Sequence, residues 1–244
     1  MLLGVVLLYV GVVLVVNGIW LIGQAQAAAA ARRAPAVGQA SAREAAAVGA
    51  SVGEAAAGQV SAGEAAARRA SAGEAAAPSA AAAVSRAEAS PMFIQNREVA
   101  VLNIFTGFVG VVAAVTLLVT GNRAGDLASV RAGGYILLFA FTYLWVSFNQ
   151  YLNAGGRAFG WYCLFVAITA IPAGIYTLQA ADGNTALIWL GINWFAWAVL
   201  WAMFWALLVL QAPIARLTGW VAILEGIGTA WILAIVVLEG ELAF

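Results

Sequence analysis

The chain of 244 residues is strongly apolar, with 64% hydrophobic and only 9% charged residues. Soluble domains carry roughly 25% charged residues, so this composition predicts an integral membrane protein. The 11 basic and 11 acidic residues cancel, which argues against a basic surface for nucleic acid. Histidine is absent, so the commonest general base and the commonest metal ligand are missing. Cys163 is the one cysteine, so neither a disulfide framework nor a thiolate metal site is available. We therefore expect no enzyme active site, cofactor or metal.

The first predicted element is an uncharged apolar run over residues 2–22. At about 1.5 Å per residue, this run is long enough to cross the hydrocarbon core of a bilayer. Ala25-Gln26-Ala27 resembles a signal-cleavage site, but the run has no positive leader and is longer than a normal signal core. We interpret residues 1–23 as a retained transmembrane helix, with Asn17 as its one polar side chain at depth.

Residues 24–92 form an insert of low complexity. Ala, Gly, Ser, Glu and Arg dominate, and a Ser-x-x-Glu unit followed by three alanines recurs every ten residues, at Ser41, Ser51, Ser61 and Ser71. Each unit is a possible capping box, but the ten-residue period keeps no apolar face on one side of a helix. The sequence therefore predicts a solvated insert, partly helical or disordered, that carries no chemistry.

Five further apolar segments in residues 93–244 complete an all-α membrane protein with six transmembrane helices. We expect these segments at about 99–120, 133–152, 159–179, 186–211 and 217–238. An even number of spans places both termini on one side of the membrane. Arginines concentrate in the insert and in the loops after the third and fifth helices, so the positive-inside rule predicts a cytoplasmic insert and external termini.

The fifth predicted helix carries a band of tryptophans. Trp194, Trp197, Trp201 and Trp205 fall within an arc of roughly 80° on one side of a helix. Tryptophans that face lipid gather in belts at the two interfaces rather than along the whole span. This band therefore indicates either a narrow pathway or a packed seam between helices, and its spacing does not distinguish the two.

Glu225 is the only acid well inside a predicted span. A charge at that depth costs about 2.5–3.5 kcal/mol on insertion scales, so such a residue usually faces a cavity or a partner. Thr218 and Thr229 lie within roughly 40° of Glu225 on the same helix. The carboxyl group is either a hydrogen-bond site for a solute or a protonated or paired group that joins two helices. No embedded basic residue offers a relay, which argues against a proton-coupled pump.

The third predicted helix has a similar polar and aromatic side. Phe141 and Trp145 are one turn apart, with Thr142 and Asn149 close to the same side. Such aromatic pairs are commonly packing, but together with the tryptophan band they favour an aromatic-walled path. A path of this kind passes a small planar neutral solute and gives ions no replacement for their hydration.

Several motifs together carry a resemblance to a known family. They are Met1–Gly11 with Asn17-Gly18, Arg97-Glu98-Val99, Leu138–Trp145, Trp161–Pro172, Asn193-Trp194 continuing to Trp201, and Gly219–Trp231. The chain resembles the AmiS/UreI family of urea and short-chain amide channels over all six helices. The insert at about 24–92 departs from the short first loop that is usual in the family.

The resemblance implies a protomer built from two three-helix repeats, and a hexameric ring with one pore in each protomer. Two positions differ from the family pattern: Leu190 stands at an aromatic position, and the aromatic after Phe141 is Trp rather than Tyr. These differences imply a wider or differently selective outer path. Carried onto this chain, the substrate pathway implied by the resemblance consists of Trp194, Trp197, Leu200, Trp201, Phe141, Trp145, Glu225, Leu3, Leu7, Val10 and Leu14.

We therefore expect a passive channel for urea or short-chain aliphatic amides in a bacterial cytoplasmic membrane, supplying a cytoplasmic amidase or urease. Its partners would be a small neutral amide, the lipid bilayer and further copies of the same chain. Acid gating in the family depends on His-rich outer loops, and because this chain lacks histidine we expect no acid activation. Two alternatives remain open at this point: a proton-coupled transporter that uses Glu225, and a structural or sensor protein that acts through the insert.

Overall fold

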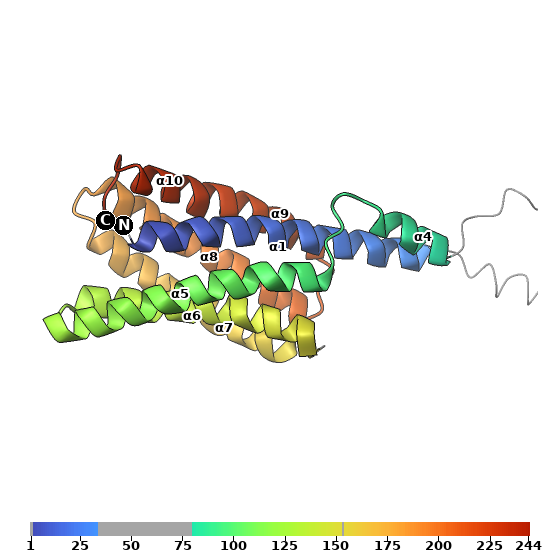
Figure 1. Cartoon of the computed structure of the whole chain (residues 1–244), viewed down its shortest axis with the longest axis horizontal. Coiled ribbons are helices and arrows are strands. Elements are labelled where there is room, and N and C mark those ends of the chain that lie inside the picture. Colours follow the sequence, from blue (N-terminus) through green and yellow to red (C-terminus); the bar gives the residue numbers. More distant parts are fainter. Residues whose placement is uncertain (1, 34–79, 153) are drawn as a thin grey trace, which may run out of the picture. The chain divides into compact units, whose positions relative to one another are not determined.

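A computed structural model of the chain describes residues 2–33, 80–152 and 154–244. The chain forms two compact units, one of Met1–Gln24 with Pro91–Phe244 and one of Ala25–Ser90. The described elements are the helices α1 (Leu2–Arg33), α4 (Ala80–Glu88), α5 (Asn96–Ala124), α6 (Leu127–Leu152), α7 (Arg157–Gln179), α8 (Thr185–Leu208), α9 (Ala215–Glu225) and α10 (Ile232–Leu238), with the π-helix η1 (Gly226–Trp231) between the last two (Figure 1).

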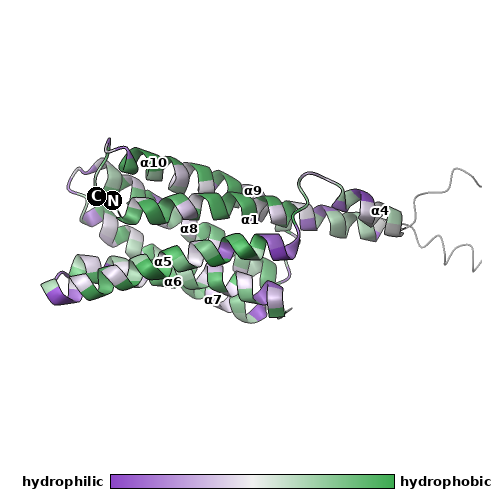
Figure 2. Ribbon diagram, viewed as in Figure 1, coloured by the Kyte–Doolittle hydropathy of each residue, from purple (hydrophilic) through white to green (hydrophobic). Residues whose placement is uncertain are grey.

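Six helical segments among the described residues are long and apolar enough to cross a membrane. The sixth is the continuous segment Ala215–Leu238, which α9, η1 and α10 share. Hydrophobic residues predominate along these segments, whereas hydrophilic residues gather mainly at helix ends and short loops (Figure 2). The prediction of an all-α protein with six transmembrane helices is confirmed.

Most of the insert expected at 24–92 lies outside the described residues, and so do its four Ser-x-x-Glu units. Where the chain is described, both edges of this region are helical. The first helix continues past residue 23 to Arg33, and α4 covers Ala80–Glu88. Both edges are rich in alanine, the residue with the highest helix propensity, so helix persists there without an apolar face to bury.

Two helical hairpins, α5–α6 and α7–α8, hold much of the transmembrane unit together. Small residues let the helices approach closely, as is usual between membrane helices. A Cβ atom added at Gly110 would lie 2.8 Å from the Ala140 Cβ, and one added at Gly174 would lie 3.0 Å from the Trp194 Cβ. The second of these contacts packs α7 directly against α8 at Trp194, the first residue of the tryptophan band.

The first helix packs against the last span through glycines spaced seven residues apart, at Gly4, Gly11 and Gly18. A Cβ atom at Gly11 would lie 2.7 Å from the backbone nitrogen of Trp231. From the opposite side, a Cβ at Gly226 would lie 2.8 Å from the Gly11 carbonyl oxygen. The two backbones are therefore in contact, and the apolar side chains of α1 turn to the interior of the unit.

This backbone contact predicts that Gly11→Val destabilises the protein by about 1–3 kcal/mol, the usual cost of overpacking, because the neighbouring atoms belong to backbone and must shift. Gly134→Val is the matched control, since nothing lies within 4 Å of a Cβ built there. Thermal melting in detergent measures the effect. Equal melting temperatures for the two variants would contradict the close contact.

Candidate solute pathway

Two cavities open within the transmembrane unit. The larger, here called the aromatic cavity, has a volume of about 600 Å³ and is lined by α1, α5, α6, α7 and α8 together with Phe244. Its lining includes Leu2 and Leu3, so it lies at the end of the bundle where Figure 1 marks both chain termini. The second cavity, of about 400 Å³, is lined at its far end by Trp20, Asn96, Asn149 and Leu208.

Helices α6 and α8 form the wall that gives the aromatic cavity its name. The Phe139 ring contacts the indoles of Trp194, Trp197 and Trp201, with ring centroids 5.4, 5.5 and 5.8 Å apart and interplanar angles of 62°, 63° and 66°. Tyr135 contacts Trp194 at 5.2 Å. Each edge-to-face contact contributes about 0.5–1.5 kcal/mol beyond burial, so Phe139 fixes three indoles at once.

Aliphatic side chains of α1 form a second part of the lining of the aromatic cavity. They are Leu2, Leu3, Val6, Leu7, Val10 and Leu14. Leu190 and Leu200 of α8 also line this cavity. The lining of the aromatic cavity thus combines indoles of α8 with aliphatic side chains of α1 and α8.

The two cavities meet at three residues from three helices. Leu14, Tyr143 and Trp201 line both cavities and are only 4%, 3% and 4% exposed. They therefore form the boundary between the two cavities. Tyr143 lines both cavities, and among the described residues its hydroxyl has no side-chain hydrogen-bond partner.

The π-helix η1 explains why the α8 side chains point as they do. Its i→i+5 geometry shifts backbone carbonyls out of α-helical register, and α8 donates to two of them. Trp189 Nε1 donates to the Gly228 carbonyl at 3.3 Å, and Asn193 Nδ2 donates to the Thr229 carbonyl. Trp197 Nε1 donates to Thr229 Oγ1 at 2.8 Å. These bonds satisfy buried donors that lipid could not satisfy.

Glu225 lies next to η1 and away from both cavities. Its side chain is 9% exposed, lines neither cavity, and its Oε2 atom has no hydrogen-bond partner among the described residues. The hydroxyls of the polar line expected beside it donate to backbone: Thr218 to the Ile214 carbonyl and Thr229 to the Glu225 carbonyl. Both hydroxyls are therefore used in hydrogen bonds within the protein, and neither threonine lines a cavity.

Arg131 is the only charged side chain that lines either cavity within the part of the chain that the structure describes. It lies near the start of α6, and its guanidinium carbon is 5.3 Å from the centroid of the Tyr176 ring. This cation–π contact holds the positive charge at the mouth of the aromatic cavity.

Asp126 caps α6 beside the same mouth. Its carboxylate accepts hydrogen bonds from Ser129 Oγ at 2.6 Å and from the Ala128 N–H at 3.0 Å. The bond from the Ser129 hydroxyl, followed by bonds from backbone N–H groups, holds the pKa of Asp126 below its ordinary value. This carboxylate therefore stays ionised between pH 5 and 7.

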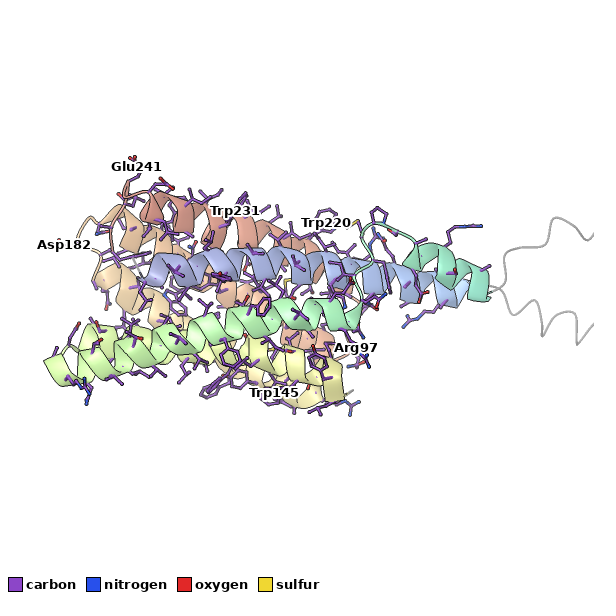
Figure 3. All side chains as sticks on the ribbon, in the orientation of Figure 1. Arg97, Trp145, Asp182, Trp220, Trp231 and Glu241 are labelled. Atoms are coloured by element: carbon purple, nitrogen blue, oxygen red, sulfur yellow. The ribbon has the colours of Figure 1, made fainter. Side chains whose placement is uncertain are left out.

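The sequence-predicted pathway residues divide into two groups. Trp194, Trp197, Leu200, Trp201, Leu3, Leu7, Val10 and Leu14 all line the aromatic cavity. Phe141, Trp145 and Glu225 line neither cavity. Phe141 is 46% exposed. The centroid of the Trp145 ring lies 5.8 Å from that of Phe159 and 5.4 Å from that of Tyr162. Figure 3 shows Trp145 at the Arg97 end of the bundle, far from Asp182 and Glu241.

Sequence reasoning missed the residues of α6 that line the aromatic cavity, namely Tyr135, Phe139 and Tyr143. Their spacing of four residues is a signal that could have found them, because it places all three on one side of a helix. Phe141 lies two residues from Phe139, about 200° around the helix, and so faces outward. The fourth tryptophan of the band, Trp205, contacts Trp161 at 6.3 Å and lines neither cavity.

Comparison with known proteins identifies the family of this chain. The model of the AmiS/UreI family of transporters matches residues 89–241, which is more than half of the chain. The chain belongs to the AmiS/UreI family. Relatives within this family include an acid-activated urea channel of Helicobacter pylori, 34% identical over 57% of this chain and 83% of its own length. A protein of Mycolicibacterium smegmatis described as an amidate substrates transporter is 36% identical over 61% of this chain and 67% of its own.

Solved structures of this AmiS/UreI family agree with the fold. The crystal structure of the H. pylori urea channel matches with a TM-score of 0.62 and 27% identity, covering all of both chains. A cryo-electron microscopy structure of that channel in a closed state matches with a TM-score of 0.64 and 26% identity, over 99% of this chain and all of the other. The six-helix architecture is therefore that of a urea channel.

The contacts of Phe139 lead to a prediction that separates it from Phe141. Phe139→Leu removes three ring contacts and should lower stability by about 1–3 kcal/mol, with a weaker near-ultraviolet circular dichroism signal. Phe141→Leu is the matched control, because Phe141 is exposed and lies outside both cavities. Melting temperature and near-ultraviolet circular dichroism in detergent measure both effects. A larger loss from Phe141→Leu would contradict this assignment of the α6 face.

Proposed function

We propose that this protein is a passive transmembrane channel for urea or short-chain aliphatic amides. The observation that carries the proposal is the pair of cavities that meet at Leu14, Tyr143 and Trp201 and together extend along the bundle. Membership of the AmiS/UreI family supports it, as do the relatives that are named for urea and amidate transport.

The walls of the aromatic cavity suit a small, planar, neutral solute. The flat indole faces of Trp194, Trp197 and Trp201 can stack against a planar amide, while the leucines of α1 exclude water. An ion would lose its hydration in such a passage without gaining ligands in exchange. Conduction needs no covalent step, so the proposed channel is not an enzyme.

Arg131 adds discrimination by charge at the mouth. A fixed positive charge opposes the approach of cations and leaves a neutral amide unaffected. Guanidinium has the planar shape of urea plus one positive charge, so comparing the two solutes isolates the effect of charge. We expect the channel to pass urea and to exclude guanidinium.

We infer the sidedness from the placement of arginines and the assembly from the family resemblance. Arginine placement supports external termini, which puts the mouth at Arg131 outside the cell and the cavity beside Asn149 toward the cytoplasm. We infer a location in a bacterial cytoplasmic membrane, where the solute would reach a cytoplasmic amidase or urease. The hexameric assembly is an expectation carried over from the family resemblance.

The first prediction for this function concerns solute selectivity. In proteoliposomes followed by stopped-flow light scattering, urea and acetamide should enter much faster than into protein-free vesicles, whereas glycerol and guanidinium should not. Trp201→Ala should lower selectivity for urea over glycerol by roughly tenfold, the factor that corresponds to losing about 1.4 kcal/mol. Trp161→Ala is the control, because Trp161 is exposed and lines neither cavity.

Two outcomes of this measurement would overturn the proposal. Wild-type vesicles that are no leakier than empty ones would exclude passive conduction. Accumulation of labelled amide against its gradient, abolished by an uncoupler, would indicate proton-coupled transport instead. The position of Glu225 outside both cavities gives no support to such coupling.

The second prediction is that acid does not open the channel. Histidine is the side chain whose ordinary pKa lies between pH 5 and 8, and the chain has none. Asp126, at the mouth, has a lowered pKa and keeps its charge over this range. Urea permeability should therefore stay constant within about a factor of two from pH 5 to 7. A steep rise on acidification, measured in the same vesicles, would contradict this prediction.

A further inference from the structure

The cavity at the Asn149 end differs in chemistry from the aromatic cavity. Four carboxamide side chains line it: Asn17, Asn96, Asn149 and Gln150. None of its lining residues is charged. We call it the carboxamide cavity. Every carboxamide offers both donors and an acceptor, so the wall presents the same pair of groups that a primary amide or urea carries.

Asn17 is held in place by a buried partner. Its Nδ2 donates to Asn103 Oδ1 at 3.1 Å, and Asn103 Nδ2 donates back to Asn17 Oδ1 at 2.8 Å. Asn103 is fully buried and also donates to the Val99 carbonyl at 2.8 Å. Both donors of Asn103 are thereby used, whereas Asn17 keeps one N–H and one lone pair for the cavity.

The other three carboxamides also keep free hydrogen-bonding capacity. Trp20 Nε1 donates to Asn96 Oδ1 at 3.0 Å, which orients Asn96 and leaves its amide group free to donate. Asn149 and Gln150 have no side-chain hydrogen bond within the described part of the chain, although both are half-buried. The cavity is therefore rich in donors and acceptors that have no partner among the described residues.

We propose that the carboxamide cavity is a binding site for neutral primary amides and urea, which a solute occupies after it has passed Leu14, Tyr143 and Trp201. This inference rests on the proposed function and extends it, because it assigns a second site of a different kind to the same path. The carboxamides replace the hydrogen bonds to water that the solute loses in the aromatic cavity. A solute whose amide hydrogens are replaced by methyl groups leaves the acceptors of the site unpaired and binds more weakly.

The experiment uses a cysteine reporter within this cavity. Val146→Cys introduces a thiol on the lining and keeps all four carboxamides; Cys163→Ala removes the native thiol. The purified protein is treated with a small neutral methanethiosulfonate, with and without acetamide. Occupancy of the site slows modification by the factor 1 + [L]/Kd, or about fivefold when acetamide is at four times its Kd. Mass spectrometry measures the modification rate.

Three comparisons make the result specific. N,N-dimethylacetamide at the same concentration should give little protection. Asn149→Leu with Gln150→Met in the reporter background should abolish protection by acetamide, and melting temperature checks that this variant is folded. Asn122→Cys, at an exposed carboxamide that lines neither cavity, should be unprotected by either amide.

Equal protection by both amides, absence of protection by acetamide, or protection that survives loss of Asn149 and Gln150 would each overturn the inference. Urea flux through the wild-type channel is measured separately. Urea flux without protection by acetamide would contradict only this binding site, whereas absence of urea flux would contradict the proposed function.

Discussion

Hydrogen bonds from α8 to the π-helix η1 fix the geometry on which the rest of the path depends. Indole and carboxamide donors buried in a membrane must find acceptors inside the protein, because lipid offers none. A carbonyl oxygen has two lone pairs, so those of Gly228 and Thr229 in η1 can accept from Trp189 and Asn193 of α8. With one side of α8 anchored in this way, Trp194, Trp197 and Trp201 line the aromatic cavity.

The backbone contact between α1 and the last span completes this arrangement from the other side. Glycines at Gly11 and Gly226 let the two helices touch, so the apolar side chains of α1 are displaced toward the interior of the unit. Leu14 belongs to both parts of this arrangement: its Cβ lies 3.0 Å from a Cβ built on Gly226, and its side chain lines both cavities. The width of the path at Leu14 therefore depends on how closely two backbones can approach.

Hydropathy and segment length were sufficient to predict the six spans, because crossing a bilayer imposes a minimum length of apolar helix. The tryptophan band was also visible, since helical periodicity alone places its members on one side. The four-residue spacing of Tyr135, Phe139 and Tyr143 places them on one side of α6, but spacing alone does not say whether this side or the side of Phe141 meets the tryptophan band. Phe139 and Phe141 are chemically identical, and only the packing of α6 against α8 turns Phe139 inward.

Glu225 illustrates a different limit of sequence reasoning. Its depth in the membrane correctly indicates a special environment, but hydropathy cannot distinguish a residue that lines a path from one beside an irregular turn. The π-helix that follows it rotates subsequent residues relative to an α-helix, so angular estimates made across this turn no longer hold. The insert poses a different problem, because its composition specifies no core against which a structure could be predicted.

The two cavities differ in the way each would compensate a solute for lost water. In the aromatic cavity, stacking on indoles and contact with leucines favour a flat, uncharged molecule but offer few hydrogen bonds. In the carboxamide cavity, Asn17, Asn96, Asn149 and Gln150 offer those hydrogen bonds without any charge. A passage with only the first kind of wall would present a high desolvation barrier, and one with only the second would retain its solute. Placing the two in series, with the Tyr143 hydroxyl at their boundary, divides the desolvation cost into smaller steps, which favours fast passage of a neutral amide.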